Sequence, residues 1–231
     1  MTKLSVNLLT AYTTSVLRGG AGMVTQPLLG PRPEKRLALY EFEGCPFCRK
    51  ARELLTALDL EAVIYPCPKN GTRFRPRAVE LGGKAQFPYL VDPNTGTAMY
   101  ESDAIIAYLV EHYGAQAAPM SLKLGPLTTF SSLMASAVRG RSAARPSRAP
   151  EQPLELYSFE ASPYCRMVRE VLCDLELPYV LHNVGKNSPS RPAFVARSGK
   201  MQVPWLHDPN TATSLFESAE IVAYLNRTYA V

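Results

Sequence analysis

The sequence predicts a mixed α/β fold that is built twice in tandem. Three observations indicate it: a long internal repeat, an alternation of short apolar strand patterns with helical patterns in each copy, and a turn sequence before the last strand of each copy. With 46% apolar residues among 231 and a net charge of +5, the composition is that of a globular protein.

The two copies match each other in several separate blocks. Leu37–Glu43 (LALYEFE) is repeated as Leu154–Glu160 (LELYSFE), and Gln86–Leu90 (QFPYL) as Gln202–Leu206 (QVPWL). Such self-similarity is the signature of a tandem duplication. The predicted organisation is an N-terminal helix and linker (1–36), unit one (37–114), a second helix with a Pro/Arg-rich linker (115–153), and unit two (154–231).

Unit one is predicted to have the element order βαβαββα, and unit two repeats it. The expected strands are 37–42, 62–66, 87–91 and 97–100, and the expected helices are 46–58, 75–81 and 102–113. Because Asp92-Pro93-Asn94-Thr95-Gly96 reads as a hairpin turn, the sheet should be mixed, with one parallel crossover half and one antiparallel half.

The N-terminal segment is rich in Ser and Thr and could pass for an organellar targeting peptide. However, Leu9–Thr14 (LTAYTT) is matched in mid-chain by Leu127–Ser132 (LTTFSS). A cleavable signal would not recur there, so we expect a structural helix before each unit. The first should carry Leu4, Leu8, Tyr12 and Val16 on one apolar face.

Two cysteines, Cys45 and Cys48, stand at the predicted start of the first helix of unit one. Free backbone N–H groups and the helix dipole favour an anion there, so Cys45 should have a lowered pKa and act as a nucleophile. Cys48, one turn on, can attack a mixed disulfide at Cys45. Half a zinc site and two buried structural thiols are the alternatives, but Cys and His show no second close pair, so no metal site is predicted.

Three motifs of unit one resemble the thioredoxin fold in its glutaredoxin and glutathione-transferase N-terminal-domain form: Cys-Pro-Phe-Cys after a strand, Phe87-Pro88 in mid-unit, and Glu101-Ser102 opening the last helix. The same order recurs in unit two. The resemblance implies a cis proline and glutathione as co-substrate, and Ser102 is expected to cap its helix. The implied glutathione contacts are Phe47, Phe87, Pro88, Glu101 and Ser102.

Unit two has Ser162 where unit one has Cys45. A hydroxyl forms no disulfide, so Ser162 is either a helix cap only, a hydrogen-bond donor to the glutathione thiolate as in serine-type transferases, or the remnant of a redox site. Cys165 and Cys173 are expected to be buried, and Cys67 is expected in a loop. The candidate second site consists of Ser162, Cys165, Val203, Pro204, Glu217 and Ser218.

The predicted function is a glutathione-linked thiol–disulfide oxidoreductase that acts through Cys45 and Cys48 on disulfide or glutathionylated proteins, with unit two a degenerate glutathione- or partner-binding unit. The second half is another α/β unit and not the all-helical domain of a transferase, which puts conventional transferase activity in doubt. The alternatives are a non-catalytic glutathione- or peptide-binding module, transferase or isomerase chemistry, and, least favoured, a 2Fe–2S cluster shared between two Cys45 sites.

Composition excludes several other classes. No apolar run is long enough for a membrane span, and scattered arginines at a pI near 9.0 argue against nucleic acid. Five cysteines, an odd number, fit a reducing compartment, so the expected location is cytoplasmic.

Overall fold

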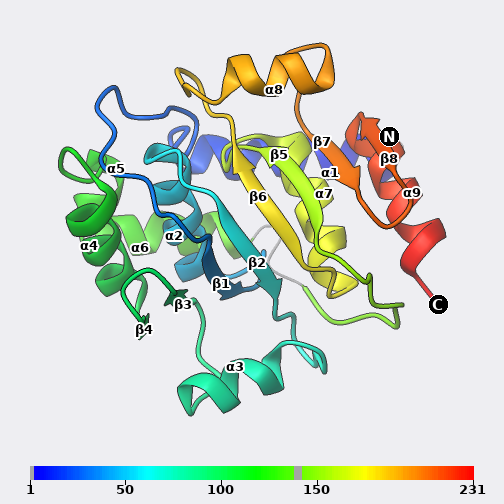
Figure 1. The fold of residues 1–231 in the computed structure, drawn as a ribbon, viewed down its shortest axis with the longest axis horizontal. Coiled ribbons are helices and arrows are strands. Elements are labelled where there is room, and N and C mark those ends of the chain that lie inside the picture. Colours follow the sequence, from blue (N-terminus) through cyan, green and yellow to red (C-terminus); the bar gives the residue numbers. More distant parts are fainter. Residues whose placement is uncertain (1–2, 138–141) are drawn as a thin grey trace.

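The protein is described by a computed structural model that covers residues 3–137 and 142–231, so residues 138–141 of the predicted linker lie outside it. The described strands form one mixed sheet in the order β4-β3-β1-β2-β6-β5-β7-β8 (Figure 1). The strands are β1 (Leu37–Glu41), β2 (Ala62–Pro66), β3 (Tyr89–Asp92), β4 (Thr97–Met99), β5 (Leu154–Ser158), β6 (Tyr179–Asn183), β7 (Trp205–Asp208) and β8 (Thr213–Phe216).

Helices cover both faces of this sheet. They are α1 (Lys3–Leu17), α2 (Pro46–Ala57), α3 (Arg75–Gly82), α4 (Ser102–Tyr113), α5 (Met120–Lys123), α6 (Pro126–Ala137), α7 (Pro163–Asp174), α8 (Arg191–Ser198) and α9 (Ser218–Tyr229). The predicted elements of unit one are confirmed to within two residues at each boundary. No helix in the described residues is long and apolar enough to cross a membrane.

The predicted mixed topology is also confirmed, because β1 pairs with β2 in parallel and with β3 antiparallel, and β3 pairs antiparallel with β4. Asp92 fixes the hairpin to the end of α4: its carboxylate accepts hydrogen bonds from the hydroxyls of Tyr108 (2.7 Å) and Tyr113 (2.5 Å) and from the backbone N–H of Asn94 (2.8 Å). Asp208 makes the same contacts in unit two.

The two units join edge to edge through β2 and β6, which run antiparallel with Val63 opposite Val180. The apolar core is continuous across this seam. Leu39 and Leu54 of unit one belong to the same buried cluster as Leu156 and Leu172 of unit two. Alternate residues of β1 point to the other face, where Tyr40 packs with Ala78 of α3. The sheet is therefore buried on both faces.

A cluster of charged side chains lies buried at the seam, beneath the core strands. Arg52 of α2 donates to Glu160 of unit two (Nε to Oε2, 2.9 Å), and Arg169 of α7 donates to Glu43 of unit one (Nε to Oε2, 2.9 Å). These are equivalent positions of the repeat, so the contacts are reciprocal. The buried ion cluster comprises Glu41, Glu43, Arg49, Arg52, Glu160, Arg166 and Arg169.

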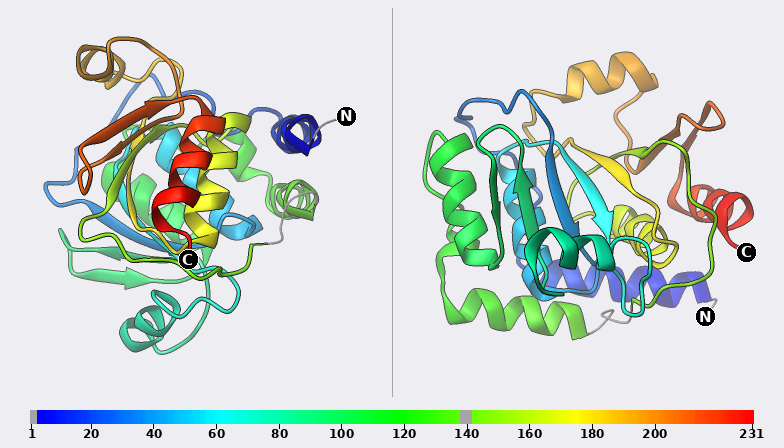
Figure 2. Two further views of the ribbon diagram at one scale, coloured as in Figure 1. Left: turned by 90° about the vertical axis from the view of Figure 1, so that its right-hand side faces the viewer. Right: turned by 60° about the horizontal axis from the view of Figure 1, so that its bottom comes forward.

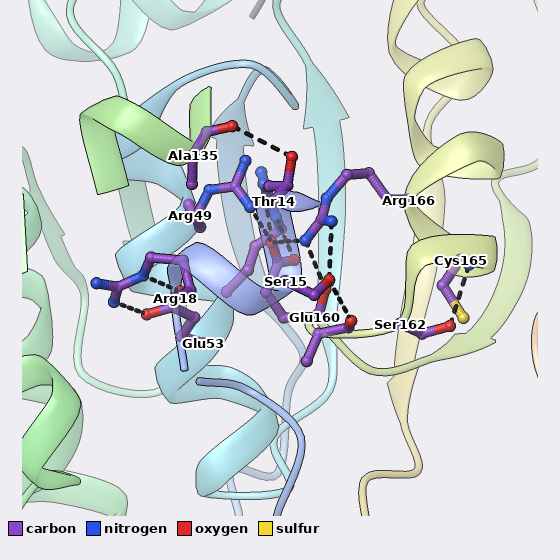
Figure 3. A network of polar contacts seen from close by, with 12 residues as sticks. Thr14, Ser15, Arg18, Arg49, Glu53, Ala135, Glu160, Ser162, Cys165 and Arg166 are labelled. Atoms are coloured by element: carbon purple, nitrogen blue, oxygen red, sulfur yellow. Dashed lines mark hydrogen bonds and ion pairs between the residues drawn. The ribbon is translucent and has the colours of Figure 1, made fainter. Parts of the chain in front are cut away.

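The helix that precedes each unit packs on the opposite unit. Ser15 of α1 donates to the carbonyl of Ala161, just before α7, at 2.7 Å, and Ser132 of α6 donates to the carbonyl of Pro46 in α2 at 2.6 Å. Arg166 in turn donates to the carbonyl of Ala11 (2.8 Å), and Figure 3 shows its side chain between α1 and Glu160. The leading helices thus tie the units together crosswise.

The residues predicted to form the apolar face of α1 do not form its buried side. Tyr12 and Val16 are 43% and 75% exposed, whereas Ala11, Thr14 and Arg18 are buried. The inward face is polar because Arg18 forms an ion pair with Glu53 of α2, and Thr14 donates to the carbonyl of Ala135 in α6 (3.3 Å; Figure 3). The side chain of Leu4 lies outside the described part.

We expect Arg52→Gln to lower the free energy of unfolding by about 3–5 kcal/mol, because it removes the arginine that pairs with buried Glu41 and one of the arginines that pair with Glu43 and Glu160. The matched control is Arg36→Gln, which removes an exposed ion pair with Glu61 and should cost about 1 kcal/mol or less. Urea unfolding measures both; equal losses in the two variants would contradict the assignment.

The buried ion cluster also predicts a pH dependence. Burial raises the pKa of Glu41 from 4.5 to about 7. Between these values the folded state holds a proton that the unfolded state has released, so this group's contribution to stability falls as pH rises. The unfolding free energy of wild type minus that of Glu41→Gln should therefore decrease from pH 5 to pH 7, by at most about 1.4 kcal/mol per pH unit. An increase over this range would contradict the prediction.

Candidate functional site

The thiol of Cys45 lies at the N-terminus of α2. The chain leaves β1, turns back so that the N–H of Cys45 donates to the carbonyl of Phe42 (3.0 Å), and enters the helix at Pro46. Cys45 is the N-cap residue, and its Sγ accepts a hydrogen bond from the N–H of Cys48 at 3.3 Å. The predicted position is confirmed, and Pro46 costs no hydrogen bond there.

The pKa values of the two thiols of unit one are shifted in opposite directions. The pKa of Cys45 is lowered, chiefly because the thiol of Cys48 donates a hydrogen bond to it, and the backbone N–H groups of Cys48 and Phe47 add to the effect. Burial raises the pKa of Cys48 well above its ordinary value. The site therefore favours a thiolate at Cys45 and a protonated thiol at Cys48.

A cavity of about 230 Å³ adjoins the first turn of α2, because Phe47 lines it. Its lining includes four of the predicted glutathione contacts, but neither Pro88 nor Cys45. The carbonyl oxygen of Phe87, one of the lining residues, lies 3.9 Å from Cys45 Sγ. Phe87-Pro88 is a cis peptide, as expected. The lining residues are Phe47, Gln86, Phe87, Glu101 and Ser102.

The expectation that Ser102 caps α4 is wrong. Glu101 is the N-cap residue, because its carbonyl accepts the first helical hydrogen bond from Ile105 (2.9 Å), and Ser102 is already helical. Glu101 also has a positive φ of 69°, which is rare for a residue with a side chain and concentrated at functional sites. This backbone turns its carboxylate toward the cavity, where Gln86 Nε2 donates to it.

One residue that lines the cavity, Gln86, and one that contacts a lining residue, Arg75, were not predicted. The guanidinium of Arg75 lies 4.9 Å from the centre of the Phe87 ring. The repeat carried a signal for Gln86, since Gln202 in unit two donates to Glu217 in the same way. Arg75 also recurs before a proline, as Arg191, but nothing in its spacing indicated contact with Phe87.

The corresponding residues of unit two keep this architecture without the first thiol. Ser162 caps α7, its Oγ accepting from the N–H of Cys165 at 3.3 Å (Figure 3). Val203-Pro204 is cis and Glu217 has a φ of 63°. Ser218, like Ser102, follows the N-cap residue and is buried. Tyr12 of α1 lies edge-on to Tyr164, with ring centres 6.0 Å apart.

The remaining cysteines are fully or almost fully buried, and burial raises the pKa of Cys67, Cys165 and Cys173. The expectation for Cys165 and Cys173 is confirmed. Cys67 lies in the loop after β2, as expected, and its side chain is buried in a cluster with Tyr40 and Tyr89. The side chains of the described residues form no cluster of three or more His, Cys, Asp or Glu suited to a metal.

A larger cavity lies elsewhere. It has a volume of about 570 Å³, is lined by Arg32, Asp59 and Ser190 among others, and contains no cysteine in its described lining. Because the smaller cavity is lined by residues of the repeated motifs and adjoins the cap of α2, we take it as the candidate site.

Iodoacetamide at mildly acidic pH should alkylate Cys45 well before Cys165 or Cys173, because Cys45 alone among the five cysteines has a lowered pKa in the structure. Peptide mass spectrometry over a time course measures the rates, and urea-unfolded protein, in which all five thiols should react, is the control. Equal rates for Cys45 and Cys165 in the folded protein would contradict the asymmetry.

Comparison with known proteins shows the family of this chain. The family described as glutathione S-transferase, N-terminal domain, matches residues 39–117 and 156–230, one segment in each unit. A glutathione S-transferase-like protein, tpcF, of Aspergillus fumigatus is 33% identical over 34% of this chain and 34% of its own, so this chain spans about a third of that relative. A solved glutathione transferase from Bombyx mori, BmGSTD1, shares 26% identity over 37% of this chain and 39% of its own, with a TM-score of 0.34. Since the family matches more than half of the chain, this protein belongs to the glutathione S-transferase N-terminal domain family.

Proposed function

We propose that this protein is a glutathione-linked thiol–disulfide oxidoreductase that acts through Cys45. One observation carries the proposal: a thiol of lowered pKa caps α2 next to a cavity lined by Phe47, Phe87, Glu101 and Ser102. Family membership supports glutathione as the ligand.

In this proposal glutathione would bind at the cavity as an extended peptide. Its cysteine backbone would pair with the backbone of Phe87 beside Cys45, which is strand-like recognition of a short peptide. Its γ-glutamyl carboxylate would lie at the N-terminus of α4, where the free N–H groups after Glu101 favour an anion. Glu101 would accept the γ-glutamyl ammonium group, with Gln86 holding that carboxylate in place.

The reaction on a glutathionylated protein proceeds by two exchanges. The Cys45 thiolate attacks the glutathione sulfur of the mixed disulfide, the protein thiolate leaves and takes up a proton, and Cys45 carries glutathione. A second glutathione, as thiolate, attacks that glutathione sulfur, releases glutathione disulfide and restores the Cys45 thiolate. Glutathione is the reductant, so the electrons balance.

A protein disulfide needs Cys48 as well. After Cys45 has formed a mixed disulfide with the substrate, Cys48 loses its proton, attacks Cys45 Sγ and expels the reduced substrate. Two glutathione molecules then reduce the Cys45–Cys48 disulfide. Cys45 is only 3% exposed and Cys48 is fully buried, which favours slender glutathione adducts over bulky disulfides.

Unit two is proposed to bind glutathione or an extended peptide without redox chemistry. Ser162 is the N-cap residue of α7, and unit two retains the Gln202–Glu217 hydrogen bond and the positive φ of Glu217. Its remaining thiol at the site, that of Cys165, is fully buried. We propose 37–114 and 154–231 as the domain boundaries. Five free cysteines support a reducing compartment such as the cytoplasm.

Substitution of each thiol tests the proposal. Cys45→Ser should abolish glutathione-dependent reduction of a glutathionylated peptide, because a hydroxyl cannot replace the thiolate. Cys48→Ser should retain this activity, since external glutathione resolves the adduct, but should lose most activity on a protein disulfide. Coupled glutathione reductase assays measure both substrates.

Cys173→Ser is the matched control, since Cys173 is a buried cysteine far along α7, and it should leave both activities unchanged. Mass spectrometry of Cys48→Ser should find one glutathione on Cys45. Full activity in Cys45→Ser would overturn the proposal, and glutathione binding without turnover in wild type would indicate a binding module instead.

A further inference from the structure

Helices α1 and α6 form a separate outer layer. Figure 2 (left) shows them side by side, beyond the helices that cover the sheet. They run antiparallel, because Thr14 contacts Ala135 while Arg18, one turn later, donates to the carbonyl of Thr128 (3.2 Å) and to Ser131 (2.6 Å). Their inner sides are held by these polar contacts and by the site helices.

In these two helices the apolar side faces outward and the small or polar side faces the rest of the protein, the reverse of an ordinary surface helix. Small or polar side chains face inward, such as Ala11, Thr14 and Ser132, each 0% exposed. Large apolar side chains face outward, at positions that recur between the two helices. This outer apolar stripe consists of Leu9 (57% exposed), Tyr12 (43%), Val16 (75%) and Leu17 (40%) of α1, and Leu127 (66%), Phe130 (62%), Leu133 (46%) and Met134 (47%) of α6.

The outer apolar stripe is large for a monomer. Its exposed area is on the order of the roughly 800 Å² that each partner contributes to a standard protein interface. Contiguous apolar patches of this size usually mark an interaction site. Thr13 is the one polar residue that is exposed between positions 8 and 17, and the exposed residues between 127 and 136 are all apolar.

The chemistry of the stripe favours a second copy of this chain. Helices that lie on a membrane surface carry Lys or Arg beside their apolar face, whereas α6 contains no charged residue and α1 contains one, Lys3 at its first position. A twofold interface brings a patch against itself, so a patch without charges meets no like-charge repulsion. We propose that α1 and α6 pack on α1 and α6 of a second copy as a four-helix layer. This proposal does not depend on the proposed function.

Sedimentation equilibrium and light scattering test it on the full chain. Wild type should show twice the 25.4 kDa of one chain, and its melting temperature should rise with protein concentration. Val16→Glu with Phe130→Glu should weaken dimerisation about ten-fold or more, because two glutamates per copy are forced into an apolar contact. Far-UV circular dichroism should be unchanged, since both side chains are exposed.

Leu81→Glu is the matched control, because Leu81 is also an exposed large apolar residue (49%) but lies on α3, which packs on the opposite face of the sheet, and it should leave the dimer intact. A monomeric wild type with a concentration-independent melting temperature would overturn the proposal, even if the double variant failed to fold. So would a folded double variant that still dimerises, or a monomer that floats with phosphatidylcholine vesicles, which would assign the stripe to a lipid surface.

Discussion

The structure depends on the antiparallel contact between β2 and β6 and on the buried ion cluster beneath it. Strand pairing alone would leave two sheets joined by a few backbone hydrogen bonds. Arginines of each unit also form buried ion pairs with glutamates of the other unit. Removal of either unit would therefore expose these charges or leave them without their partners. This requirement makes the duplicated chain one cooperative body with one apolar core.

The same contact dictates where the site can lie. The charged sides of α2 and α7 are used at the seam, where Arg52 and Arg169 bind the opposite unit. Their N-terminal ends do not take part in these ion pairs. These are the ends where a thiolate or a capping oxygen is stabilised. The crossed packing of α1 and α6 holds both ends from outside, through Ala161 and Pro46.

The cap positions of the two units differ in one atom. Cys45 Sγ and Ser162 Oγ occupy the same cap position and accept the same backbone hydrogen bond at 3.3 Å. Sulfur there can exist as an anion and exchange disulfides, whereas oxygen only caps the helix or donates a hydrogen bond. The paired contact of Gln202 and Glu217 persists in unit two, so this contact does not depend on a cysteine at the cap position.

The sequence by itself determined the elements, the mixed strand order within each unit and the cap position of Cys45, because these follow from local periodicity, turn residues and the repeat. It also identified Phe47, Phe87, Glu101 and Ser102, which the structure brings to one cavity, although it put the cap of α4 one residue late. The seam, the crossed helices and the outward face of Tyr12 and Val16 came only from the tertiary structure. Periodicity states which residues share a helix face but not what that face meets; here a buried arginine, Arg18, required polar neighbours and turned the apolar side of α1 outward.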